Sequence, residues 1–492
     1  MNYSQFLLML PEAALIVALL IVFMADLVCP RVPCERAKTL SILTILLLVG
    51  TLAADFFAEP VTAFGGMYVT SNAVNLMKII LTAGTIIVVI MAHPWIEYND
   101  TNRRVGEFYE LILSTLLGMY MMMSSGHFLM FFLGLEMASV PLACLVAFDK
   151  YKRVSAEAAA KYILVATFSS GVMLFGISFI YAAAGTLYYD GVLDSLTKGY
   201  LFSPLQIMGL VFFFSGLGFK LSLVPFHFWT ADTYQGAPTP VTGYLSVISK
   251  GAAALTLLII LEKAFAPMAD YYQPMLWVVI ILSITVANLF AIRQTELKRF
   301  MAFSSISQAG YIMLAVIGNN FQLSTTALIY YVLVYVVANM AVFTVINVVE
   351  HKGQPTANGQ QLTAMSTYDG FYQTNPKLAF LMTLALFSLA GIPPFAGMFS
   401  KFFVFMAGVS GHEGYPFWSY FVVFIALINT VVSLYYYLLI VKAMYIKKTD
   451  TPLPTFQSDG YTKIAMAICT AGIALFGVVS CIYDWIYASA GA

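Results

Sequence analysis

Residues 218–240, GFKLSLVPFHFWTADTYQGAPTP, place a lysine, a proline and a histidine close together inside a strongly apolar chain. Pro225 cannot donate a backbone hydrogen bond and disrupts the turn before it, so we expect the apolar span that contains Lys220 to be broken. Broken helices occur at membrane depth where their backbone lines a cavity or is buried in protein. This stretch therefore predicts a membrane protein with an interrupted helix in its interior.

The composition predicts the same class of fold. Of the 492 residues, 61% are hydrophobic and 10% are charged, whereas soluble domains carry about 25% charged residues. Only helices and closed barrels satisfy their backbone groups inside a bilayer, and the long apolar runs lack the alternation of a barrel. We therefore predict an all-α polytopic membrane protein. Its net charge of zero argues against a nucleic-acid partner.

The apolar runs predict about fourteen transmembrane helices, most of them near the ~20 residues that cross the hydrocarbon core. We expect them near residues 11–29, 39–57, 74–93, 109–125, 128–148, 158–184, 204–228, 241–265, 275–292, 301–318, 323–349, 377–408, 417–446 and 462–487. Most Lys and Arg residues lie in or beside loops that follow odd-numbered spans, and the other side holds only Lys78, Lys198 and Lys263. By the positive-inside rule, the odd-following loops are expected in the cytoplasm and both termini outside.

Two interrupted spans, the seventh and the twelfth, predict an inverted repeat, because such a pair in corresponding halves is typical of transporters. Aligning residues 224–226 with residues 393–395 gives an offset of 169. Each repeat would contain five helices, and an odd number inverts the second repeat. The predicted segments are 1–98 (an N-terminal three-helix segment), 99–268 (the first five-helix repeat), 269–448 (the second, inverted repeat) and 449–492 (a C-terminal transmembrane helix).

Four charged side chains lie deep within these apolar spans: Glu136, Lys220, Lys250 and Lys401. Each costs roughly 2.5–3.5 kcal/mol at mid-bilayer on insertion scales, so buried ionisable groups usually mark an ion or proton path. The alternative is that the lysines extend to an interface, with an apolar stem and a solvated head. We favour a proton path, because four such groups would oppose insertion unless they faced one another or water.

Motifs for cofactors are not evident. The five cysteines form no CxxC and no Cys/His cluster, which disfavours iron–sulfur and zinc sites. No GxGxxG follows a strand and no GxxxxGK[ST] occurs, so no nucleotide or flavin site is indicated. The energy for transport is therefore expected to come from a gradient or from a partner.

Several long stretches resemble the antiporter-like subunits of respiratory complex I over essentially the whole chain. They are PFHFWTADTYQGAPTPVT (225–242), ELKRFMAFSSISQAGY (296–311), LAGIPPFAGMFSKF (389–402) and the LGLE that ends at Glu136. Within that family the chain is most similar to subunit N of NADH–quinone oxidoreductase, the counterpart of mitochondrial subunit 2. It ends after a fourteenth predicted span and carries a lysine in the twelfth, where subunit M typically carries glutamate.

The resemblance implies a proton-translocating role and a place for each charged residue. Glu136 would pair with Lys220, Lys250 would be the central relay, and Lys401 would be the terminal lysine toward the outside. No cofactor would be bound on this chain; NADH, FMN, iron–sulfur clusters and quinone would belong to partner subunits. The implied partners are subunits M, A, J and K and the lipid bilayer, in a bacterial inner membrane.

Other polar residues are secondary candidates. His227 lies beside the break, and histidine titrates near neutral pH. A functional role and a structural role are equally expected for it. Ser305 and Gln308 are possible relay residues between Lys250 and Lys401, although such residues also serve as interhelical hydrogen bonds. Asp232 is expected in a turn before the eighth span.

Three other functions remain open. One is an Mrp-type cation/proton antiporter, which would favour carboxylates and carbonyls over lysines at the broken helices. Another is the equivalent subunit of a hydrogenase-type or ferredoxin-driven complex. The third is a passive scaffold whose lysines have no role.

Overall fold

The computed structural model describes residues 3–29, 33–98, 104–198, 202–352, 362–410, 416–449, 453–456, 458–479 and 481–490. The long helices are α1 (Leu10–Val28), α2 (Pro33–Phe56), α3 (Asn72–Tyr98), α4 (Val105–Met123), α5 (Phe128–Val146), α6 (Arg153–Ala184), α8 (Pro204–Leu221), α10 (Thr239–Lys263), α11 (Ala269–Ile292), α12 (Leu297–Val316), α13 (Phe321–Lys352), α15 (Pro376–Ala390), α16 (Ala396–Val409), α17 (Pro416–Tyr445) and α18 (Gly460–Val478). The short elements are α7 (Tyr189–Thr197), α9 (Phe228–Gly236), α14 (Phe371–Thr374), α19 (Cys481–Ala490), β1 (Thr62–Ala63) and β2 (Tyr68–Val69).

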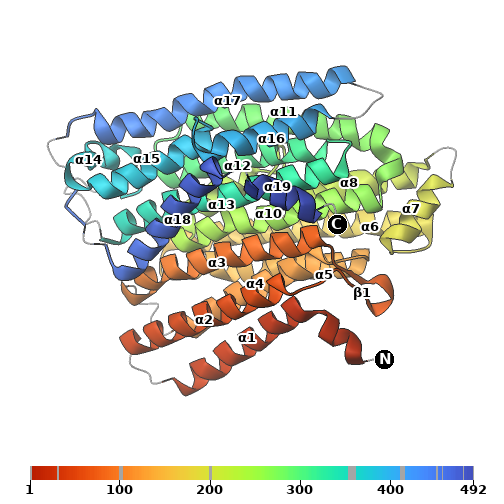
Figure 1. The fold of residues 1–492 in the computed structure, drawn as a ribbon, viewed down its shortest axis with the longest axis horizontal. Coiled ribbons are helices and arrows are strands. Elements are labelled where there is room, and N and C mark those ends of the chain that lie inside the picture. The colour runs from red at the N-terminus through yellow and green to blue at the C-terminus, as the bar shows by residue number, and fades with distance from the viewer. Residues whose placement is uncertain are drawn as a thin grey trace.

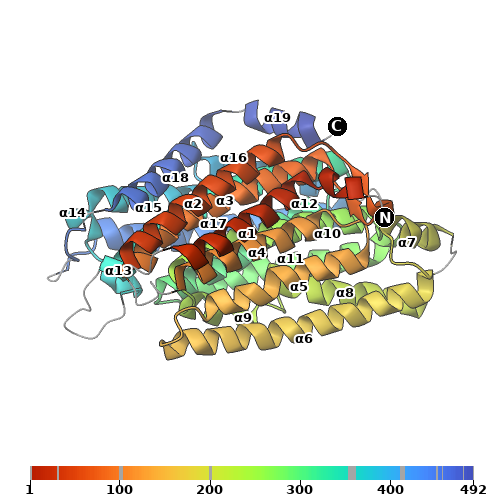
Figure 2. The ribbon, with the colours of Figure 1, turned by 90° about the horizontal axis from the view of Figure 1, so that it is seen from below.

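The long helices lie side by side along the long axis of the molecule, with α1 at one edge and α17 at the opposite edge (Figure 1). Seen from below, α6 lies along one edge, while α18 and α19 lie along the other (Figure 2). Among the described spans, α10 and α13 are the most completely buried. The interior of the bundle is therefore built around α10, which carries Lys250, and its neighbour α13.

Each predicted span coincides with a helix or a pair of helices, which confirms the polytopic all-α fold. Eleven of the described helices are long and apolar enough to cross a membrane. The other three predicted spans coincide with α4, with α12 and with the pair α15 and α16. The count of fourteen membrane crossings and the four-part division of the chain stay predictions.

Both predicted breaks are present. Helix α8 ends at Leu221 and α9 begins at Phe228, while α15 ends at Ala390 and α16 begins at Ala396. A proline follows each helix end, and a residue without a backbone N–H cannot continue the hydrogen-bonded ladder. The predicted ranges 204–228 and 377–408 are therefore each divided rather than continuous.

The two helix ends before the breaks have the same local geometry. Ser222 and Gly391 both adopt left-handed conformations, with φ of 60° and 88°, and they lie 169 positions apart. The backbone N–H after each residue reaches back five positions: Leu223 donates to the Gly218 carbonyl at 2.9 Å and Ile392 to the Phe387 carbonyl at 3.1 Å. Such bonds satisfy carbonyls at a helix end. The two helix ends thus share one geometry at the offset found in the sequence, and the inverted repeat stays a prediction.

Some elements are absent from the sequence prediction. The antiparallel pair β1 and β2 and the short helix α7 lie in connections that were expected to be loops. The fourteenth predicted span, 462–487, ends earlier, because α18 stops at Val478 and a separate short helix, α19, follows. The strands and α7 arise outside the long apolar runs, where hydrophobic patterning carries little information, whereas the break after α18 lies inside an apolar run that hydropathy alone does not divide.

Candidate functional site

Lys220 is buried near the end of α8, with 4% of its surface exposed. Its Nζ donates a hydrogen bond to Ser139 Oγ on α5 at 2.8 Å. The break after α8 brings Trp229 back onto this helix end, where its Nε1 donates to the Phe219 carbonyl at 3.2 Å. The interrupted helix thus encloses Lys220. Its side chain therefore does not extend to a membrane interface in this structure.

The expected direct pair between Glu136 and Lys220 is not formed among the described residues. Glu136 is half-buried, and its Oε1 has no hydrogen-bond partner there. Ser139 lies one helical turn further along the same face of α5, and its hydroxyl takes the lysine instead. Glu136 lies near enough to Lys220 for an electrostatic interaction without a direct contact.

Lys250 lies at the middle of α10 with 1% of its surface exposed. Its Nζ donates to Ser305 Oγ on α12 at 2.7 Å and lies 5.7 Å from the centre of the Tyr234 ring. The Ser305 hydroxyl is also 3.2 Å from the Tyr234 hydroxyl. The structure thus brings together Lys250 and Ser305, two residues that the sequence singled out separately.

Gln308 lies one turn beyond Ser305 on α12 and joins three further helices, α13, α15 and α17. Its Nε2 donates to the Leu389 carbonyl and to the Tyr437 hydroxyl, each at 3.2 Å, and its Oε1 accepts from the Tyr331 hydroxyl. Ser304 shares the Tyr437 hydroxyl at 2.5 Å. The polar groups of α12 therefore continue from Lys250 toward the second broken helix.

Lys401 is buried on α16, with 4% of its surface exposed, and its Nζ donates to the Ala390 carbonyl at 3.0 Å. That carbonyl belongs to the last residue of α15, immediately before the break. Lys401 and Gln308 line the same small cavity of about 10 Å³, close to the least volume that holds one water. Lys401 also lies 4.8 Å from the centre of the Tyr311 ring.

Two tyrosines that the sequence analysis missed lie near the contacts of Lys220 and Lys250. Tyr162 on α6 has a buried hydroxyl with no hydrogen-bond partner among the described residues, and it lies near both Ser139 and Tyr234. Tyr234 contacts the Ser305 group described above. The region between Lys220 and Lys250 is therefore occupied by phenol groups, whose spacing in the sequence gives no signal of this proximity.

His227 takes no part in the contacts of the three lysines. It is 6% exposed, its Nδ1 has no partner among the described residues, and its ring stacks on Phe228 at 4.6 Å. A functional role for His227 stays a prediction.

The prediction that Asp232 lies in a turn is wrong, because Asp232 belongs to the short helix α9. Its carboxylate forms ion pairs with Lys161 at 2.7 Å and with Arg299 at 2.6 Å. Asp232 therefore ties together α6, α9 and α12 at one end of the bundle.

Lys78, one of the three basic residues assigned to the outer side, is fully buried within the bundle. Its Nζ lies 2.7 Å from Glu12 Oε1 in an ion pair inside the N-terminal helices. Lys78 interrupts an apolar run and was a detectable signal, but its partner is 66 residues away in the sequence. Among the described residues, no group of three His, Cys, Asp or Glu side chains could hold a metal ion.

Comparisons with known proteins agree with one another. The family described as NADH:quinone oxidoreductase/Mrp antiporter, TM, matches residues 125–433. The chain is 54% identical over 484 residues, 98% of each chain, to NADH-quinone oxidoreductase subunit N of Phocaeicola vulgatus. It is 48% identical to the protein of the same name from Azobacteroides pseudotrichonymphae, covering 99% of this chain and 98% of that one.

Solved structures show the same architecture. A chain of respiratory complex I from Thermus thermophilus matches with a TM-score of 0.77 and 29% identity, covering 96% of this chain and 98% of that one. A chain of the Mrp complex from Dietzia sp. matches with a TM-score of 0.81 at 19% identity, covering 100% and 97%, which shows a common fold alone. Because the chain is 54% and 48% identical to two subunit N proteins over nearly its full length, it belongs to the subunit N family of NADH-quinone oxidoreductases.

Proposed function

We propose that this chain is a membrane-arm subunit of NADH–quinone oxidoreductase and that it carries protons through Lys220, Lys250 and Lys401. The observation that carries the proposal is the burial of all three lysines, each with at most 4% of its surface exposed and each bonded to a neutral oxygen. Buried ionisable groups inside a membrane span are costly and usually mark an ion or proton path.

The contacts support an order for the path. Lys220 bonds to Ser139, Lys250 bonds to Ser305, and the polar groups of α12 lead to the cavity that Gln308 shares with Lys401. Electron transfer in partner subunits would drive the path by changing the charge near Lys220, with Glu136 as the nearest candidate carboxylate. Ser305 and Gln308 are secondary relay residues in this proposal.

The surroundings of the chain are part of the same proposal. Neighbouring subunits would be M, A, J and K, and NADH, FMN, iron–sulfur clusters and quinone would be held by partner subunits. The membrane would be a bacterial inner membrane with both termini on the periplasmic side. The identity to bacterial subunit N proteins supports this assignment.

The test is proton pumping by the assembled complex with Lys220→Met, Lys250→Met or Lys401→Met. Methionine keeps an apolar stem of similar length and removes the charge, so assembly on a native gel should be retained. We expect the number of protons moved per NADH oxidised to fall in each variant, since the path is interrupted. Lys198→Ala is the matched control, because Lys198 is exposed at the end of α7.

Three variants that pump at the stoichiometry of the parent complex would contradict the proposal. In that case the chain would be a scaffold, or its protons would follow another route.

A further inference from the structure

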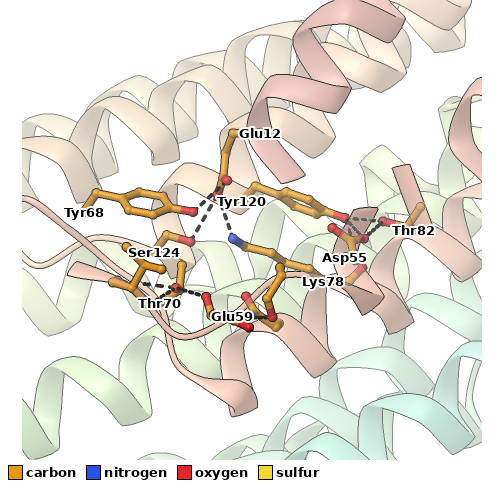
Figure 3. A network of polar contacts seen from close by, with 12 residues as sticks. Glu12, Asp55, Glu59, Tyr68, Thr70, Lys78, Thr82, Tyr120 and Ser124 are labelled. Atoms are coloured by element: carbon orange, nitrogen blue, oxygen red, sulfur yellow. Dashed lines mark hydrogen bonds and ion pairs between the residues drawn. The ribbon is translucent and has the colours of Figure 1, made fainter. Parts of the chain in front are cut away.

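A second group of buried charges lies outside the lysine path, where the first four helices meet. Glu12 comes from α1, Asp55 from α2, Lys78 from α3 and Tyr120 from α4, and each is at most 1% exposed. Figure 3 shows their polar ends converging, with Lys78 between the two carboxyl groups. We call these four residues the N-terminal cluster. None of them has a role in the proposed path.

Glu12 is saturated with donors. Its Oε1 lies 2.7 Å from Lys78 Nζ and accepts from Ser124 Oγ at 3.2 Å, and its Oε2 accepts from the Tyr68 hydroxyl at 2.8 Å (Figure 3). Hydrogen bonds and a cation both stabilise a charged carboxylate. Glu12 and Lys78 therefore form a complete, buried ion pair.

Asp55 is satisfied on one oxygen only. Its Oδ2 accepts from the Tyr120 hydroxyl at 2.6 Å and from Thr82 Oγ1 at 3.2 Å, while its Oδ1 is buried without a partner among the described residues. Lys78 Nζ lies 5.2 Å from the centre of the Tyr120 ring, but it is bonded to Glu12. Within the described part of the chain, Asp55 thus has no cation of its own.

The charges of the cluster do not cancel if both carboxyl groups and the lysine are ionised and the tyrosines are neutral. The ionisable groups that face one another are Glu12, Asp55, Tyr68, Lys78 and Tyr120. Two carboxylates and one ammonium leave one net negative charge, and an uncompensated buried charge is strongly unfavourable. One proton shared by the two carboxyl groups makes the cluster neutral. Asp55 Oδ1 is the atom that can carry this proton, because it has no hydrogen-bond partner among the described residues.

A cavity of about 500 Å³ is lined by residues that adjoin the cluster's hydrogen-bond partners in the chain. Its lining includes Val69 and Ser125, which directly follow two donors to Glu12, Tyr68 and Ser124. The Val69 N–H also donates to the Ser124 carbonyl at 2.9 Å. The two residues whose hydroxyls bond to Glu12, Tyr68 and Ser124, are thus chain neighbours of residues that line this cavity.

The same cavity reaches the loops that follow even-numbered spans, because Asp190 and Lys263 also line it. These loops are the predicted outer side of the protein. All four cluster residues lie toward that end of their helices, since Glu12 and Lys78 are near helix starts and Asp55 and Tyr120 are near helix ends.

We propose that the N-terminal cluster is a second proton-binding site, which holds one exchangeable proton on Asp55 and Glu12 and exchanges it with water in the outer cavity. A proton arriving from the cavity protonates a carboxylate oxygen, and the same proton returns to water when the site empties. The proton reaches Glu12 past the hydroxyls of Tyr68 and Ser124, which bond to its carboxylate. Lys78 and Tyr120 then connect Glu12 to Asp55.

The test is infrared spectroscopy of the assembled complex, read as the difference between parent and variant in the C=O band of protonated carboxyl groups. We expect Asp55→Asn to remove one such band. Glu12→Gln should also remove it, because Lys78 would then take Asp55 as its counterion. Lys78→Met should add a second band, since two carboxyl groups without a cation would both be protonated.

The band must also shift when the buffer is changed from H2O to D2O, because the proposed proton exchanges with water. Asp26→Asn is the matched control: Asp26 lies on α1 as well, but it has its own cation, Arg36, at 2.6 Å. An unchanged carboxyl region in Asp55→Asn, no added band in Lys78→Met, or a band insensitive to D2O would each overturn the proposal. None of these readouts requires proton pumping. They therefore test the N-terminal cluster independently of the proposed lysine path.

Discussion

At the scale of single residues, the three lysines share one property: each donates to a neutral oxygen, from Ser139, Ser305 or the Ala390 carbonyl. Breaking a buried ion pair costs about 3–5 kcal/mol, whereas a lysine held by a hydroxyl or a carbonyl leaves no buried counter-charge behind when it loses its proton. The contrast is Lys78, which is paired directly with Glu12 at 2.7 Å. The contacts thus suit the three lysines to proton transfer and Lys78 to holding a fixed charge.

The Ser305 hydroxyl is the sharpest test of this idea. Ser305→Ala removes the acceptor at 2.7 Å from Lys250 Nζ, and a hydrogen bond to a charged group contributes about 1.5–3 kcal/mol. At about 1.4 kcal/mol per factor of ten, proton transfer through Lys250 should slow about tenfold or more. The measurement is NADH-driven proton pumping by the assembled complex.

Thr256→Val is the control for Ser305→Ala. Thr256 is buried on α10, near Lys250, and its hydroxyl donates to the Ala252 carbonyl of its own helix. We expect near-normal pumping from it. Equal pumping rates in the two variants would show that the Lys250–Ser305 contact is not on the path.

At the scale of elements, the second broken helix is held together by close backbone contact. A Cβ added at Gly397 on α16 would lie 1.6 Å from the Ser388 carbonyl oxygen of α15. Lys401 lies one turn after Gly397, and its side chain packs against Gly391 in the break. The absence of a side chain at Gly397 therefore sets the distance between α15 and α16, and with it the position of the lysine.

Gly397→Ala should separate these two helices and weaken the contact of Lys401 with the Ala390 carbonyl. Overpacking of this kind costs about 1–3 kcal/mol, so we expect a lower thermal midpoint for the assembled complex and reduced pumping. Gly171→Ala on α6 is the control, because nothing lies within 4 Å of its added Cβ and alanine favours a helix by about 1 kcal/mol. A complex with Gly397→Ala as stable and active as the control would contradict the role given to this contact.

The elements also show how far the sequence alone could lead. Proline and glycine residues inside apolar spans predicted both breaks, and the apolar runs predicted the helices, because these signals are local in the sequence. The contact of Lys220 with Ser139 in place of Glu136 depends on which turn of α5 faces α8, which periodicity does not fix. The pairing of Lys78 with Glu12 joins α1 and α3, and no local pattern reports so distant a partner.

At the scale of the whole molecule, charged residues from separate helices meet at one end of the bundle. Asp232 joins Lys161 and Arg299, and Lys298 pairs with Glu350 at 3.1 Å. All three basic residues lie on the side that the positive-inside rule assigns to the cytoplasm. The fold therefore gathers the loops after odd-numbered spans at a common end, as an antiparallel bundle requires.

The last prediction concerns the orientation of this bundle in the membrane. In a background where all five cysteines are replaced by serine, Lys152→Cys and Lys198→Cys place one thiol on each predicted side. The side chain of Lys152 is 62% exposed and Lys198 is exposed as well, so both positions are open to a reagent. A membrane-impermeant maleimide should label Lys198→Cys in intact spheroplasts and Lys152→Cys only in inverted vesicles, because basic loops stay in the cytoplasm. Labelling of both positions from one side would mean that a crossing between them has been miscounted, and the opposite labelling would place both termini in the cytoplasm and turn the cavity beside the N-terminal cluster toward the cell interior.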